Sequence, residues 1–150
     1  MTAVRYPLGP SLDALRRLWR LEHALAQLSK RMERRLGITA PQRLIVRCVG
    51  RYPGITAGQL ATTLHVDPGT VSAALRRLEA RGLLERRRDP RDRRRVVLGL
   101  TRVGHALDQP GPGTVEHSLE LLLDELPAAE VEQFGALLDR FAALVEAEGR

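Results

Sequence analysis

The sequence predicts a mainly α-helical domain with one small two-stranded β-hairpin. Apolar residues recur at helical spacing along most of the chain, and helix caps and Pro-Gly breaks divide it into separate helices. One short segment, residues 96–101, alternates in the manner of a strand. The length of 150 residues and the hydrophobic content of 43% fit a single domain, which we expect over residues 1–150.

Two helices are expected before residue 53. Residues 11–36 form the first, capped by Ser11 and ended by Gly37, and the second runs from Thr39 to about Tyr52. Apolar residues in the first recur at alternating steps of three and four, which is typical of a helix that packs against a partner helix. These residues are Leu18, Leu21, Leu25, Leu28 and Met32.

A pair of short helices joined by a tight turn comes next. Thr56 caps the first, Asp67 caps the second with Pro68 in its first position, and Gly82 ends the pair. His65 lies in the turn, where a positive φ is tolerable for histidine. The buried face of the second helix is predicted to hold Val71, Leu75 and Leu78.

Residues 86–95 read RRRDPRDRRR and hold seven arginines. A charge run of this kind is often a solvated linker, but here it lies between LLE at 83–85 and the strand pattern VVLGLT at 96–101. We therefore expect a β-hairpin with apolar roots, in which the arginines form the arms and the tip and DPRD at residues 89–92 is the turn.

Three further helical segments complete the chain. Thr101 caps the first, and PGPG at 110–113 interrupts the pattern before it resumes. The last helix follows Pro127. Its apolar face holds Val131, Phe134, Leu138, Phe141 and Val145.

Charge is divided unevenly along the chain. Residues 1–102 carry 22 basic and 8 acidic side chains, whereas residues 103–150 carry 2 basic and 10 acidic ones. Every basic side chain except Lys30 is arginine, which forms bidentate contacts with phosphates and guanine edges. This asymmetry indicates a polyanionic partner for the first part of the chain. An acidic substrate is the alternative, but a broad positive field suits nucleic acid better, and we expect double-stranded DNA.

Helix, turn, helix and charged hairpin, in this order, predict a winged helix-turn-helix domain. The second helix of the pair would enter the major groove and read bases with a face of small, hydroxyl and arginine side chains. Those residues are Gly69, Thr70, Ser72, Ala73, Arg76 and Arg77.

The hairpin is expected to supply a second DNA contact. Asp89 and Asp92 would hold its turn, and Arg94, oriented by Asp92, would insert into the minor groove, where the negative potential is focused. Phosphate contacts are expected from Arg86, Arg87 and Arg95.

The stretch RDPRDRRRVVLGLTRVG at residues 88–104 resembles the wing of MarR-type transcriptional regulators, whose pattern is close to DPxDRRxxxLxLTxxG. The order of elements matches this family along nearly the whole chain. The resemblance implies a homodimer held by helices at about 11–36 and 114–148, around a DNA-binding lobe at about 39–101. It also implies a repressor of a pseudo-palindromic operator that a small, aromatic anionic ligand relieves. Two features depart from the family: histidine in place of glycine in the turn, and the PGPG break.

A ligand pocket is a further expectation. Trp19 and His23 share one face of the first helix, and with Arg43 and Arg47 of the second they would line a site for an aromatic anion. The alternative is that the tryptophan packs in the dimer core.

Cys48, the only cysteine, lies among apolar neighbours in LIVRCVG, which favours a structural thiol over a redox sensor. His105 and His117 lack the His-x-x-x-His spacing that places two ligands on one helical face, so neither metal nor cofactor is expected.

Other classes of protein find little support. The sequence contains no GxSxG, phosphate loop or HExxH motif, so an enzyme is not expected. Its apolar runs, such as LLL at 121–123, are too short to span a membrane, and the N-terminus lacks an apolar signal core. We expect a cytoplasmic regulator. The alternatives are a non-specific architectural DNA-binding protein and a redox-sensing regulator that acts through Cys48.

Overall fold

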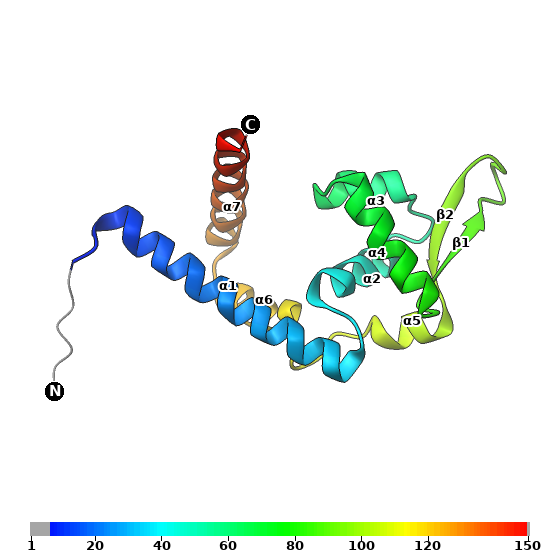
Figure 1. Ribbon diagram of the computed structural model, residues 1–150, viewed down its shortest axis with the longest axis horizontal. Coiled ribbons are helices and arrows are strands. Elements are labelled where there is room, and N and C mark those ends of the chain that lie inside the picture. The colour runs from blue at the N-terminus through cyan, green and yellow to red at the C-terminus, as the bar shows by residue number, and fades with distance from the viewer. Residues whose placement is uncertain (1–6, 150) are drawn as a thin grey trace.

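The structure is a computed structural model that describes residues 7–149 (Figure 1). In this part of the chain it is mainly helical with one two-stranded hairpin, which confirms the predicted fold class. Residues 1–6, part of the N-terminal stretch that is expected to lack a signal core, lie outside the described range. The elements are α1 (Gly9–Leu36), α2 (Ala40–Arg51), α3 (Ala57–Leu64), α4 (Pro68–Ala80), β1 (Leu84–Arg88), β2 (Val96–Leu100), α5 (Arg102–Leu107), α6 (Val115–Asp124) and α7 (Ala128–Glu148).

Side-chain caps begin most helices where they are predicted. The hydroxyls of Thr39, Thr56 and Thr101 and the carboxylate of Asp67 each accept a backbone N–H of the following helix. The cap predicted at Ser11 is wrong: α1 begins earlier, after Leu8, without a side-chain cap and with a proline in its first turn. Proline fixes φ near the helical value, so this helix starts without the hydroxyl.

The hydrophobic core lies in the lobe formed by α2 to α5 and the hairpin. Its fully buried members come from every element of the lobe except α5, which contributes the half-buried Leu107. Burial of this apolar surface is the main source of the lobe's stability. The core residues are Ile38, Ile45, Val46, Val49, Ile55, Leu60, Ala61, Val71, Leu75, Leu78, Leu83, Leu84, Leu98 and Leu100.

The hairpin, or wing, is antiparallel and pairs Leu84 with Leu100 at its root and Arg88 with Val96 at its outer end. The first strand runs through Arg88, so arginines form this arm of the hairpin beyond its apolar root, as predicted. The backbone N–H of Leu98 donates to the carbonyl of Ile55 at 2.8 Å, which attaches the wing to the lobe.

The predicted break at PGPG is confirmed, since α5 ends at Leu107 and α6 begins at Val115. Helices α1, α6 and α7 lie beyond the lobe (Figure 1). They carry apolar side chains that the rest of the described chain leaves exposed. These side chains include Leu12, Leu15, Trp19, Leu21 and Leu25 of α1, Leu119 and Leu122 of α6, and Leu137, Leu138, Phe141, Leu144 and Val145 of α7. No helix within residues 7–149 is both long and apolar enough to cross a membrane.

Candidate nucleic-acid interface

Helix α4 presents two different faces. Val71, Leu75 and Leu78 are fully buried against the lobe core, which fixes the helix about its own axis. The opposite face leaves exposed or half-buried all six residues predicted to read DNA, Gly69, Thr70, Ser72, Ala73, Arg76 and Arg77. The face is therefore accessible, small near the N-terminus of the helix and basic further along.

The turn before α4 is held by local bonds. His65 ends α3 in the left-handed conformation, with φ of 50° and ψ of 41°, as the sequence predicts. Asp67 then accepts the backbone N–H of Thr70 at 2.9 Å. These bonds set the direction in which α4 leaves the turn.

The wing tip is a short loop organised by two aspartates. The carboxylate of Asp89 accepts the backbone N–H of Arg91 at 2.9 Å, and that of Asp92 accepts the N–H of Arg94 at 3.0 Å. The N–H of Asp89 donates to the carbonyl of Arg95, so the tip spans residues 89–95 and is longer than the predicted turn at 89–92. The sequence-based role of both aspartates as turn holders is confirmed.

Four wing arginines are engaged within the chain. Arg86 forms an ion pair with Glu79 of α4 at 2.8 Å, and Arg87 pairs with Glu85. Arg88 donates to the carbonyl of Arg93, and Arg95 donates to the side chain of Gln59 at 3.0 Å. These pairs tie the wing to itself, to α4 and to α3.

Other arginines of this surface have no such bond. Within the described residues, no hydrogen bond or ion pair engages the guanidinium groups of Arg76, Arg77, Arg91, Arg93 or Arg94. Arg91 and Arg93 were not singled out from the sequence, although they belong to the same charge run. What distinguishes Arg91 and Arg93 is that their guanidinium groups have no partner within the described residues, and only the folded chain reveals this.

An open groove of about 830 Å³ separates α3 from the wing. Hydroxyl and amide side chains of Gln59, Thr62 and Thr63 line it together with Arg95 of the wing. Gln59 has a double role, because its Oε1 accepts both the backbone N–H of Thr56, as part of the α3 cap, and the guanidinium of Arg95.

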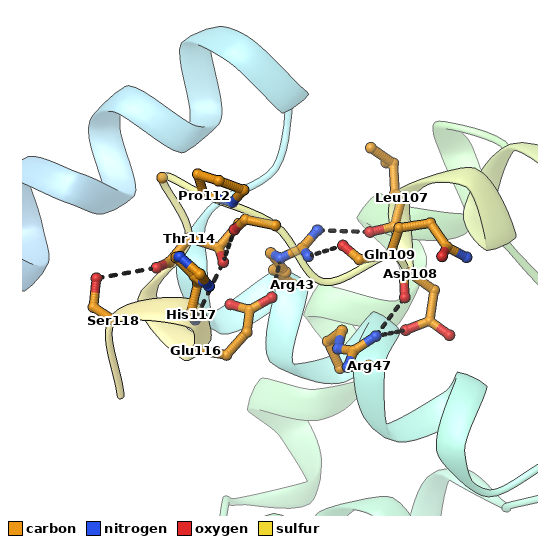
Figure 2. A network of polar contacts seen from close by, with 12 residues as sticks. Arg43, Arg47, Leu107, Asp108, Gln109, Pro112, Thr114, Glu116, His117 and Ser118 are labelled. Atoms are coloured by element: carbon orange, nitrogen blue, oxygen red, sulfur yellow. Dashed lines mark hydrogen bonds and ion pairs between the residues drawn. The ribbon is translucent and has the colours of Figure 1, made fainter. Parts of the chain in front are cut away.

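The four residues predicted to line a ligand pocket do not come together within one protomer. Trp19 is 67% exposed on α1, and His23 contacts Gln27 of the same helix. Arg43 is buried and Arg47 half-buried, and both donate to residues 107–116 (Figure 2). The two arginines do not form the expected anion site, because their guanidinium groups already donate hydrogen bonds to carbonyls and carboxylates of the same chain.

Cys48 lies half-buried in α2. Burial raises the pKa of its thiol, and the positive charge of Arg47 offsets this only in part. Since the thiolate is the reactive form, the fraction of nucleophilic sulfur at pH 7 is reduced, which weighs against a redox sensor.

We expect iodoacetamide to alkylate Cys48 more slowly in the folded protein than in the urea-unfolded chain at pH 7.5. The folded-state rate should keep rising with pH past the point at which the unfolded chain levels off, because the folded pKa is the higher one. Mass spectrometry of quenched samples measures both rates. Faster alkylation of the folded form would support the redox alternative.

The family model described as "MarR family" matches residues 38–96, which cover the core of the lobe and most of the wing. The crystal structure of MarR is similar to this chain: it is 31% identical, with a TM-score of 0.61, over 97% of this chain and 99% of MarR. The chain belongs to the MarR family. It is a DNA-binding transcriptional regulator with the family's winged helix fold.

Other MarR-family relatives agree with this assignment. The MepR–DNA complex of S. aureus is 26% identical with a TM-score of 0.69, covering 91% of this chain and 99% of MepR. PcaV of Streptomyces coelicolor, solved with its natural ligand, is 29% identical with a TM-score of 0.65, covering 95% and 98% of the two chains. The organic hydroperoxide resistance regulator of Bacillus subtilis is 33% identical over 54% of this chain, and the match spans 57% of that relative's length.

Proposed function

We propose that this MarR-family protein is a cytoplasmic, homodimeric repressor that binds a pseudo-palindromic operator. The single observation that carries the proposal is the accessible α4 face, on which unpaired arginines lie beside small and hydroxyl side chains. Small residues allow the helix to approach base edges, and arginine donates two parallel hydrogen bonds to guanine. A repressor acts by occupying DNA that the transcription machinery needs.

In this proposal the DNA contacts divide by role. Arg76, with Thr70 and Ser72, reads bases from the major groove, while Arg94 enters the adjacent minor groove. Arg77, Arg91 and Arg93, whose side chains are unpaired, contact phosphates together with Arg86, Arg87 and Arg95. The last three would exchange a partner within the chain for a phosphate when DNA binds.

Dimerisation is supported by the uncovered apolar faces of α1, α6 and α7. A monomer that exposed so many leucines and phenylalanine side chains in water would associate. Two copies related by a two-fold axis would bury these faces together and present two α4 helices to one side of the DNA.

A small ligand that relieves repression completes the proposal, and PcaV, solved with its natural ligand, supports it. Because Arg43 and Arg47 are occupied within the chain, the site for such a ligand would use residues that only the dimer brings together, with Trp19 and His23 of the exposed α1 face as candidates.

Fluorescence anisotropy tests the function directly. The purified protein is titrated onto a duplex from its own upstream region and onto a shuffled duplex, over a range of salt concentrations. We expect a preference for the native duplex of about 10³ or more at physiological salt. Equal affinity for both duplexes, lost steeply as salt rises, would instead indicate an architectural binder that grips phosphates.

Two variants separate base reading from general attraction. Arg76→Ala should weaken binding to the native duplex by about 1–3 kcal/mol and reduce the preference over the shuffled one. Arg20→Ala, which removes an equal charge from an exposed site on α1, should leave that preference unchanged. If both variants lower affinity for both duplexes alike, base reading by α4 is contradicted.

A further inference from the structure

The segment that links the lobe to α6 is held by three arginines from other helices. Residues 108–114 contain the PGPG break. Arg43 and Arg47 of α2 donate to this segment and to its two ends (Figure 2). Arg35 of α1 donates to it as well. We refer to these three side chains as the arginine clamp.

The clamp replaces the hydrogen bonds that a continuous helix would make. Where a helix ends, its last carbonyls have no backbone N–H partner. Here the carbonyl of Leu107 accepts from Arg43 at 2.6 Å and that of Gln109 from the same side chain at 2.7 Å, while the carbonyl of Asp108 accepts from Arg47. On the far side of the break, Arg35 donates to the carbonyls of Pro112 and Gly113 at 3.0 and 3.2 Å.

Arg43 is the centre of the clamp because it is 2% exposed and also pairs with Glu116 in the first turn of α6. A buried guanidinium is tolerated only where its charge is paired and its N–H groups are bonded. The single side chain thus joins the end of α5, the break and the start of α6, so these three parts keep a fixed relation to α2.

Two glycines allow the segment to lie so close. A Cβ on Gly50 of α2 would come within 2.1 Å of the Asp108 carboxylate, which pairs with Arg47 at 2.9 Å. Gly113 has φ of 76°, and a Cβ there would lie 2.7 Å from the guanidinium of Arg35. The close contact is therefore built into both sides of the clamp.

We propose that Arg35, Arg43 and Arg47 are positioning residues that set the half-site spacing accepted by the dimer. The inference rests on the proposed function, since it assumes two lobes on one operator. In the described chain no continuous helix connects the lobe to α6, so the orientation of each lobe is fixed by the clamp and by the short connection at residues 37–39. A rigid clamp admits one spacing, whereas a loosened one admits several.

The test uses a duplex that the wild-type protein selects in vitro from a random library, and derivatives with 1 or 2 base pairs inserted between the half-sites. Each inserted pair turns the far half-site by about a tenth of a helical turn. For the wild type we expect two added pairs to lower affinity on the order of 100-fold, because the second lobe no longer engages.

The clamp variant is Arg35→Ala/Arg47→Ala, and its control is Arg34→Ala/Arg51→Ala, which removes equal charge from exposed, unbonded sites on the same two helices. The clamp variant should lose less than about 10-fold on the two-pair insertion, since a looser lobe reaches the displaced site. The control should keep the wild-type penalty, and affinity for a single half-site should be equal in both variants.

Each result has one meaning. If the clamp variant keeps the full spacing penalty, the positioning role is wrong while the proposed function stands. If the wild type selects no duplex with paired half-sites, the proposed function fails and the positioning role fails with it. Should the double variant lose its helical circular dichroism, Arg35→Ala is compared with Arg34→Ala in the same series, and the same two criteria apply.

Discussion

The double variant Leu137→Glu/Leu144→Glu is expected to be monomeric and to bind operator DNA at least about 100-fold more weakly than the wild type. The reason is that binding to a second, linked half-site raises the overall affinity by a factor on the order of 10²–10⁴. Both leucines are more than half exposed on the same face of α7, at 58% and 60%. In a dimer core, carboxylates at these positions would be buried without partners.

Sedimentation velocity measures the oligomeric state, and anisotropy measures the affinity. Gln133→Glu provides the control, because it introduces a carboxylate at an exposed polar position of the same helix. A double variant that remains dimeric and keeps its operator affinity would show that α7 lies outside the dimer interface.

Gly104→Ala is expected to destabilise the lobe by about 3 kcal/mol, the upper part of the range for overpacked cores. A Cβ at this position of α5 would lie 2.0 Å from the carbonyl oxygen of Leu83 and 3.4 Å from the Cβ of Leu100. The first of these atoms belongs to the backbone at the root of the wing, so the helix or the strand would have to move.

Urea denaturation followed by circular dichroism measures this effect. The matched control is Gly58→Ala in α3, where a Cβ would meet nothing within 4 Å. There alanine should leave stability unchanged or raise it by up to about 1 kcal/mol, since it loses less backbone entropy than glycine. Equal stability of Gly104→Ala and the wild type would mean that α5 shifts away without cost.

The features that the sequence predicts well depend on neighbours in the chain. The caps at Thr56, Asp67 and Thr101 act on N–H groups three residues later, so their partners are already known from the sequence. The buried stripe of α4 follows from helical spacing alone. The positive φ of His65 agrees with the family resemblance, in which glycine is usual at this position of the turn.

What could not be predicted depends on contacts between distant residues. Arg43 and Glu116 are 73 positions apart, and Arg95 and Gln59 are 36 apart. No periodicity indicates which of the arginines finds such a partner, so the paired Arg86 and the unpaired Arg94 look alike in the sequence. The same holds for Gly104, where a side chain is excluded because the backbone of Leu83 lies so close.

The bonds within the wing bear on the thermodynamics of DNA binding. Flexible arginine side chains normally lose rotamer freedom when they bind, which lowers the affinity gained from each contact. Here the carboxylates of Asp89 and Asp92 bond backbone N–H groups of the wing tip and so order the tip before DNA arrives. Part of the entropy loss is thus incurred on folding, and the wing is preorganised for the duplex.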